Sequence, residues 1–446
     1  MTPPSAAGRV SALARRLPVR PGEGARVSLS ALYFFALLSS YYVLRPVRDE
    51  MGVRAGIGKM PWLFTATSVV MLLAVPLFGW VVSRFPRRRL VPAMHLLFAS
   101  NLLILSAALR SRGSARWAGP FLFVWVSVVS VLAVSASWSL FSDIYAREEA
   151  RRLFGIIAAG GSAGALAGPA ATSLLAPRVD AAWLLGVSAV LFLACAALSR
   201  TLARSAPASG REPPSRPIGG AALSGVGRTA RSPLLLALVA ALVCSTFVST
   251  VLYFSQTEIV GRAVRDSGQR TALFARMDLA VNALAILLQL LVTAPLVRRI
   301  GIGGALGVVA GSITVGVAAL AAFPGLTTVV ILQIAHRAAH FAVGRPARET
   351  LLVPLDAEAR YKAKSFIDTA VFRVADSASA WTLAGLGSLG AGLASIAWLT
   401  VPVGIAWTGA CWWIGRRWER RSARSEMDAA PEGGGGEAPV AGRSCA

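Results

Sequence analysis

The sequence is poor in the residues that build disulfides and metal sites. It has four cysteines and three histidines in 446 residues. The cysteines show neither a pairing pattern nor a metal-ligand spacing, so we expect free thiols that behave as small apolar side chains. His336 and His340 are four residues apart and share a helix face, but no third ligand accompanies them. We therefore expect no metal ion.

The motifs of ATP hydrolysis and of zinc-dependent catalysis are also missing. The chain has no phosphate-binding P-loop and no His-Glu-x-x-His sequence. No other motif in the sequence indicates a catalytic centre. We therefore expect that the protein is not an enzyme and needs no cofactor, and that any transport would draw on an ion or exchange gradient instead of ATP.

Lysine is nearly absent, because arginine supplies all but three of the 45 basic residues. With abundant alanine and glycine, this bias is typical of a GC-rich bacterial genome. The net charge of +24 would suit a nucleic-acid-binding protein. The charges, however, cluster in alternate loops between apolar runs and form no stripe with interleaved aromatic residues. This distribution follows the positive-inside rule of membrane proteins, so we expect no nucleic acid as a partner.

Apolar residues are what the sequence has in excess. They make up 55% of the chain, and the mean hydropathy is +0.62. They occur in runs of roughly 18–25 residues, the length that a helix needs to cross about 30 Å of hydrocarbon. Lipid forces each backbone polar group to be satisfied within its own segment, so the runs are expected to be helices. We predict an all-α membrane protein with twelve transmembrane helices near 27–48, 61–83, 90–110, 117–141, 154–176, 181–199, 233–257, 271–296, 302–323, 325–344, 365–389 and 393–415.

A polar stretch in the middle of the chain separates two sets of six apolar runs. Arginines gather in this stretch, at both ends of the chain, and in the loops near 84–89 and 298–299. The positive-inside rule therefore places both termini in the cytoplasm and the protein in the bacterial inner membrane. The predicted units are a basic N-terminal arm (1–26), a first six-helix bundle (27–199), a cytoplasmic linker (200–232), a second six-helix bundle (233–415) and a disordered tail (416–446).

Two segments resemble motifs of the major facilitator superfamily. The segment 79–88 follows the loop pattern Gly-x-x-x-Asp-Arg-x-Gly-Arg-Arg, with Ser83 in place of the Asp and Pro86 in place of the second Gly. The glycines of the segment 155–168 resemble the antiporter motif, although ordinary packing of small residues explains them equally well. The resemblance implies two six-helix bundles that rock around a central site, as secondary transporters do.

A second resemblance concerns the segments 41–52, 142–145 and 151–155. Together they are similar to the ATP/ADP translocases of plastids and intracellular bacteria, and more specifically to free-living bacterial relatives of that family. The resemblance implies that Arg48 and Asp143 act on the substrate. It also implies a helix-seven Glu and a helix-eleven Lys.

The chain departs from the translocases at both of these last positions. The segment 252–258 offers no Glu at the expected place, and Asp376 lies nearest to the position of the Lys. Nucleotide exchange is therefore a hypothesis that the matching residues suggest and the missing charges weaken.

Ionisable side chains within transmembrane helices cost roughly 2.5–3.5 kcal/mol each on insertion scales, which makes them functional candidates. The four charges near Pro46 fit either a central cavity or the outer membrane interface. Arg373 and Asp376 are three residues apart and could pair, whereas Asp278 is expected at the interface. The candidate substrate-binding residues are Arg45, Arg48, Asp49, Glu50, Asp143, Arg337, Arg373 and Asp376.

Charged residues in the predicted cytoplasmic loops are candidates for a gate. Arg348 and Glu349 are expected to lock against the charged segment 356–364, although a solvated loop explains them equally well. The candidate gating residues are Arg84, Arg87, Arg151, Arg348 and Glu349.

These features predict a secondary active transporter that moves a polar or anionic solute, with a nucleotide-like solute as one option. Its partners would be the solute, a coupling ion and the lipid bilayer, and we expect a monomer. A non-transporting membrane scaffold or a lipid-handling protein is the alternative. The interior distinguishes the two classes, because a transporter needs a polar cavity between its halves.

Overall fold

The computed structural model describes residues 19–111, 113–205, 232–351 and 366–429. Within these ranges the chain forms helices and no strand, as the apolar runs predict. Ten helices are long and apolar enough to cross a membrane. The predicted linker, the segment 356–364 and the ends of the chain fall wholly or largely outside the described residues.

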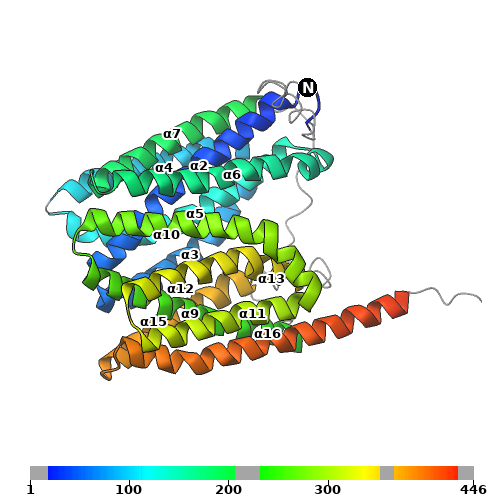
Figure 1. Cartoon of the computed structure of the whole chain (residues 1–446). Coiled ribbons are helices and arrows are strands. Elements are labelled where there is room, and N and C mark those ends of the chain that lie inside the picture. Colours follow the sequence, from blue (N-terminus) through cyan, green and yellow to red (C-terminus); the bar gives the residue numbers. More distant parts are fainter. Residues whose placement is uncertain (1–18, 112, 206–231, 352–365, 430–446) are drawn as a thin grey trace, which may run out of the picture.

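Six long helices form the first half of the described chain, and consecutive ones run in opposite directions (Figure 1). A short 3-10 turn, Ile57–Lys59, joins the first two. The helices are α2 (Gly24–Ala55), α3 (Met60–Arg84), α4 (Arg87–Arg110), α5 (Ala115–Ile144), α6 (Arg147–Leu175) and α7 (Ala181–Ser205).

The second half is also helical but less regular. Three π-helical segments interrupt it, and Gly301 breaks α11 with a φ of 70° and a ψ of 173°. This backbone conformation suits glycine, which has no Cβ. The segments are α9 (Pro233–Ala263), α10 (Ser267–Leu288), η2 (Gln289–Thr293), α11 (Ala294–Ala322), α12 (Leu326–Ala339), η3 (His340–Gly344), α13 (Arg345–Leu351), η4 (Phe366–Val371), α15 (Phe372–Ser388) and α16 (Leu393–Ala429).

Several helices are longer than predicted. α2 continues through Pro46 to Ala55, so the charges that seemed to end the first apolar run lie inside the helix. Neighbouring helices in a bundle can accommodate a proline in this way. α16 continues to Ala429, beyond the predicted end at 415, and the prediction of disorder from 416 is wrong up to that residue. The extension contains neither proline nor glycine after residue 415 to stop it.

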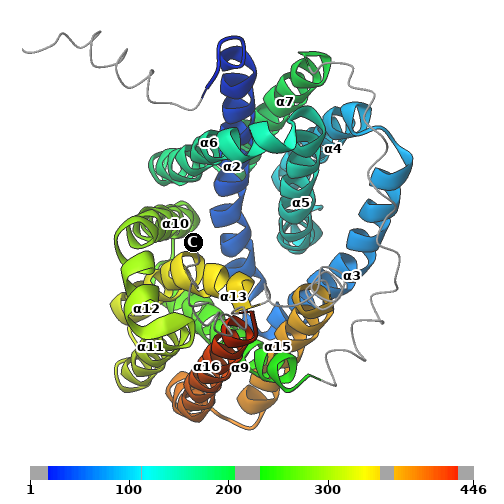
Figure 2. The same cartoon turned by 90° about the vertical axis from the view of Figure 1, so that its right-hand side faces the viewer.

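The two halves lie side by side and meet through a few helices (Figures 1 and 2). α10 packs against α6 and α2, while α3 packs against α15. We call the end of the molecule at which α2 begins the Gly24 end, and the opposite end the Ala55 end. Asn282 of α10 accepts a hydrogen bond from Tyr42 at 3.0 Å and donates one to the backbone of Ala165 at 2.9 Å.

Glycines allow α6 to lie directly against α2. A Cβ atom on Gly164 would be 2.3 Å from the backbone oxygen of Phe35, and one on Gly168 would be 2.7 Å from that of Ser39. These distances are too short for real atoms, so the backbones would have to separate. The glycine pattern thus serves close helix packing.

We expect Gly164→Ala to destabilise the protein by about 1–3 kcal/mol, because overpacking a tight contact costs this much. Gly155→Ala, on the same helix, is the matched control, since a Cβ at Gly155 would meet no atom within 4 Å. It should leave stability unchanged or raise it slightly, because alanine favours helix more than glycine does. Thermal unfolding of both variants in detergent checks this, and equal melting temperatures would contradict the packing argument.

Candidate functional site

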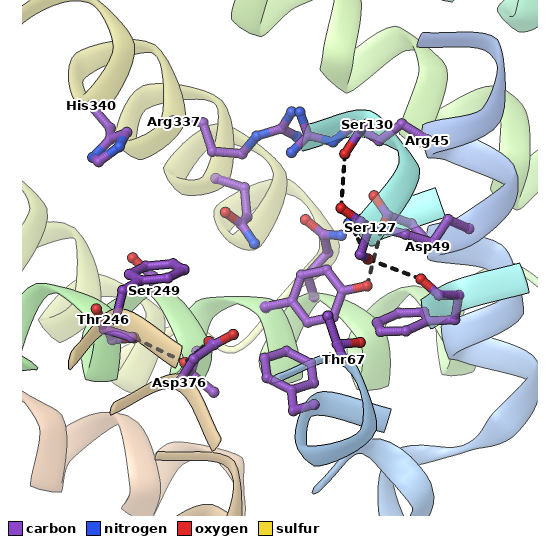
Figure 3. A pocket seen from close by; sticks show the side chains of 18 of the residues that line it. Arg45, Asp49, Thr67, Ser127, Ser130, Thr246, Ser249, Arg337, His340 and Asp376 are labelled. Carbon is purple, nitrogen blue, oxygen red and sulfur yellow. Dashed lines mark hydrogen bonds and ion pairs between the residues drawn. The ribbon is translucent and has the colours of Figure 1, made fainter. Parts of the chain in front are cut away.

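A polar cavity of about 520 Å³ lies between the two halves (Figure 3). α2, α3 and α5 of the first half contribute to its wall, as do α9, α12, η3 and α15 of the second. Four arginines and two aspartates line it, together with hydroxyl, amide and aromatic side chains. The charged lining residues are Arg45, Arg48, Asp49, Arg337, Arg373 and Asp376.

One wall of the cavity holds two arginines that share a carboxylate. Arg337 donates a hydrogen bond to Asp278 Oδ1, and the Nε of Arg45 lies 3.7 Å from the same oxygen. Asp278 is only 1% exposed and stands behind the arginines. In Figure 3 the guanidinium groups of Arg45 and Arg337 point toward one another. Because Arg45 belongs to α2 and the other two residues to α10 and α12, this cluster bridges the halves.

A second charge cluster also crosses between the halves. Arg48 donates two hydrogen bonds to Asp49 Oδ1, at 3.0 and 2.6 Å, and one to Ser127 at 3.4 Å. Tyr253 of α9 donates to the same Asp49 oxygen at 3.0 Å. The guanidinium of Arg48 also stands over the ring of Phe123. Arg48 and Asp49 are therefore largely satisfied by protein groups.

Asp376 lies on the opposite wall, next to α9 (Figure 3). Its Oδ1 accepts a hydrogen bond from Thr250 at 3.3 Å. Arg373, one helical turn away, stands over the ring of Phe372. The two residues line the same cavity, but the expected Arg373–Asp376 ion pair is not among the salt bridges of the described residues. His336 lines the same cavity, and its Nε2 lies 3.2 Å from the hydroxyl of Ser249 in a hydrogen bond.

A buried carboxylate, that of Glu50, joins two helices near the Ala55 end of the molecule. Glu50 is 0% exposed and accepts two hydrogen bonds from Arg270, at 2.7 and 2.8 Å. Arg54 donates a third at 3.0 Å and also binds Ser267. Glu50 thus ties α2 to α10, and it does not line the cavity.

Ion pairs near the Gly24 end join helices of the first half. Arg26 pairs with Glu149, and Arg152 pairs with Glu23. The hydrogen bond from Arg152 lowers the pKa of Glu23, while burial raises the pKa of the neighbouring Tyr145. The link between Arg152 and Glu23 is therefore present at neutral pH and is lost only as the pH falls through that lowered value.

The predicted gating residues lie near this same end and do not form one cluster. Arg87 pairs with Asp143, Arg84 stands over the ring of Trp80, and Arg348 pairs with Asp368 at 3.1 Å. Arg151 is exposed on α6, and Glu349 lies on α13. The segment 356–364, the expected partner of Arg348 and Glu349, lies outside the described residues.

The structure corrects three placements. Asp143 was expected to contact substrate but is at the end of α5, paired with Arg87 and outside the cavity lining. Glu50 is likewise outside the lining. Asp278 was expected at the membrane interface and is instead buried behind Arg45 and Arg337. Its polar neighbour Asn282, four residues on, was the one sequence signal of a polar helix face.

Comparison with known proteins identifies a family with this architecture. The sequence model of the Major Facilitator Superfamily matches residues 27–344. A comparison with curated protein sequences gave no match.

Several solved transporters share the fold. The nucleoside transporter NupG has a TM-score of 0.63 at 10% identity, over 88% of this chain and 99% of that one. A POT family transporter in complex with 5-aminolevulinic acid has a TM-score of 0.62 at 11% identity, over 88% and 96%. A D-xylose-proton symporter has a TM-score of 0.58 at 15% identity, over 86% and 96%. The family match over most of the chain, with this agreement in fold, shows that the protein belongs to the Major Facilitator Superfamily.

Proposed function

We propose that the protein is a secondary active transporter that moves a small polar anion across the bacterial inner membrane by alternating access. The observation that carries this proposal is the charged cavity between the two halves. Buried charges are costly in a membrane protein and commonly mark a solute pathway. Four arginines against two aspartates give the lining an excess of positive charge, which favours an anionic solute.

The helix pattern supports twelve membrane crossings. The ten candidate spans include one of 56 residues, Ser267–Ala322, which is about twice the length that one crossing needs. The break at Gly301 divides it into two crossings. α15 with η4 supplies one more. The proposed units are thus two six-helix bundles, 27–199 and 233–415, with the arm, the linker and both termini on the cytoplasmic, arginine-rich side.

The contacts between the halves suggest which state of the cycle is present. The ion pairs of Glu50, the Arg48 cluster and an edge-to-face pair of Trp62 and Trp381 all lie between mid-molecule and the Ala55 end. If the Gly24 end is cytoplasmic, this is a state closed to the outside. Transport would require these bonds to break while new ones form at the Gly24 end, and a solute can drive that change only by binding the two states differently.

The charge of the cavity says more about the class of solute than the similarity to solved transporters does. The similar structures are a nucleoside transporter, a D-xylose-proton symporter and a POT family transporter in complex with 5-aminolevulinic acid, and at identities of 10–15% they share only the fold with this chain. The nucleotide-like solute suggested by the resemblance of Arg48 to a translocase residue fits the positive cavity. A small sugar phosphate or organic acid fits it as well.

Uptake by purified protein in liposomes tests the proposal. Radiolabelled nucleotides, sugar phosphates and organic acids are offered together with their uncharged counterparts, nucleosides and sugars. We expect at least one anion to be taken up and its uncharged counterpart to be excluded. Failure of every anion to cross, with correctly inserted protein, would contradict transport of an anion.

Reversing the charge of Arg48 is expected to reduce this uptake by at least about tenfold, equivalent to roughly 1.4 kcal/mol. Arg48→Glu removes both hydrogen bonds to Asp49 and places a carboxylate beside it, next to the Asp49 oxygen that accepts the hydrogen bond from Tyr253 across the halves. Arg262→Gln, a change of a 74% exposed side chain on α9, is the control and should keep full uptake. Membrane insertion is measured for both variants, and unchanged uptake by Arg48→Glu would defeat its role.

A further inference from the structure

Three buried polar atoms without a hydrogen-bond partner belong to the cluster of Arg45, Arg337 and Asp278 at one side of the cavity. They are the Nε of Arg45, the Nε of Arg337 and the Oδ2 of Asp278. Two more such atoms, the Oγ1 of Thr246 and the Nδ1 of His336, belong to the lining of the same cavity. Buried polar atoms are nearly always paired, so each exception asks for an explanation. These atoms themselves are shielded, but the side chains of Arg45 and Arg337 are each 15% exposed and line the cavity, so a ligand there can reach these guanidinium groups.

The arginines of this region differ in how far protein groups satisfy them. Arg48 donates three hydrogen bonds, and Arg270 donates four. Within the described residues Arg337 donates one, and Arg45 has only its distant ion pair with Asp278. A guanidinium carries five N–H groups. Arg45 and Arg337 therefore keep most of their donors for another partner, whereas Arg48 and Arg270 do not.

The charge balance at this wall is also incomplete. Within the described residues these two guanidinium groups share one carboxylate, that of Asp278, which leaves a net charge of +1 at this partly buried wall. Buried charges without a partner are strongly destabilising. Because Asp278 lies behind the arginines and does not line the cavity, a second anion can approach only from the cavity side.

We propose that Arg45 and Arg337 together bind a phosphoryl group of the transported solute, with Asp278 as the residue that positions them. This rests on the proposed transport function. A carboxylate has two oxygens, which one guanidinium can satisfy with two parallel hydrogen bonds. A phosphoryl group has three terminal oxygens and can bridge two guanidinium groups. The paired arginines therefore favour phosphate over carboxylate.

The remainder of the cavity suits a hydroxylated ring. Thr67, Ser127 and Gln333 offer hydroxyl and amide groups, and Phe64 and Phe123 offer apolar faces. Its volume of about 520 Å³ lies within the 300–1,000 Å³ range of small-molecule sites. The solute class is thus a small phosphorylated sugar or similar ring, held at its phosphoryl end by α2 and α12 from opposite halves.

Ligand-dependent thermal stability of the purified full chain tests this site. The probes are inorganic phosphate, glucose 6-phosphate, glucuronate and glucose at constant ionic strength. A bound ligand raises the melting temperature by mass action. We expect phosphate and glucose 6-phosphate to raise it and glucose to leave it unchanged. Stabilisation by glucuronate without stabilisation by either phosphate compound would overturn the phosphoryl assignment, and so would the absence of any shift.

Substitution of single arginines tests whether phosphate binds at Arg45 and Arg337. Arg45→Gln and Arg337→Gln should each raise the phosphate concentration for half-maximal stabilisation at least about tenfold, the change expected for a lost charge-assisted hydrogen bond of roughly 1.5–3 kcal/mol. The exposed Arg262→Gln should keep the wild-type value. If Arg45→Gln or Arg337→Gln does not fold, the corresponding Lys variant keeps the charge, loses the fork geometry and should still bind more weakly. Wild-type phosphate concentrations for half-maximal stabilisation in both Arg45→Gln and Arg337→Gln would overturn the assignment.

Uptake separates this inference from the proposed function. Phosphate binding that requires Arg45 and Arg337, without uptake of any solute, would keep the site and remove the transport proposal. Uptake of an anion that persists in both variants would keep transport and remove the site.

Discussion

Glu50→Gln is expected to open the Ala55 end of the protein. Glu50 is fully buried and joins α2 to α10 through Arg270, with Arg54 as a second cation. Removing one partner of a buried ion pair costs about 3–5 kcal/mol, because the remaining charge is left without compensation. This cost falls only on the state in which the helices meet here, so the population should shift strongly toward the state open at this end.

Labelling of a cysteine in the cavity measures that shift. Gln256 lines the cavity on α9 and is buried, so Gln256→Cys reports access from the Ala55 end. The native cysteines are first replaced. With Glu50→Gln added, a membrane-impermeant maleimide applied on the side of the membrane that the Ala55 end faces should react at least about tenfold faster, which a shift of roughly 1.4 kcal/mol already produces.

Glu258→Gln provides the matched control for the gate. Glu258 pairs with Arg262 four residues on, at the same end of the molecule, but Arg262 is mostly exposed. Exposed pairs contribute about 0–1 kcal/mol, so labelling should stay near the reference rate. Equal labelling rates in Glu50→Gln and Glu258→Gln would show that the Glu50 ion pairs do not hold this end closed.

The sequence was sufficient for the helices because apolar runs of membrane-spanning length leave the backbone no alternative in lipid. It was less informative about where helices begin and end. The sequence predicts an interfacial Asp278 because its apolar run begins near residue 271. α10 begins at Ser267, so Asp278 lies 11 residues inside, which corresponds to about 16 Å along the axis.

The partners of the candidate residues could not be predicted, because they come from other helices. Arg45 and Arg48 are predicted from sequence as costly charges in the membrane, and both line the cavity. Their chemistry differs because of Asp278 and Tyr253, which are more than 200 residues away in the chain. Asp143 shows the reverse case. The family resemblance implies a substrate contact for Asp143, but its position at the end of α5 brings it to Arg87 instead of the cavity.

Asp278→Asn is expected to destabilise the protein more than loss of any exposed ion pair. Asp278 is the one carboxylate that Arg45 and Arg337 share within the described residues, and it is almost fully buried. Its neutralisation leaves two partly buried guanidinium groups facing one another. A loss of about 3–5 kcal/mol in unfolding free energy follows from the cost of an uncompensated buried charge.

Asp143→Asn is the control, because that carboxylate is 33% exposed and its ion pair with Arg87 is partly solvated. We expect a loss below about 1 kcal/mol there. Thermal unfolding of both variants is then repeated with inorganic phosphate. A phosphate bridging Arg45 and Arg337 would replace the missing carboxylate, so phosphate should raise the melting temperature of Asp278→Asn more than that of Asp143→Asn. Equal effects of phosphate would show that the two arginines do not accept an anion between them, and equal stability without phosphate would show that Asp278 does not hold them.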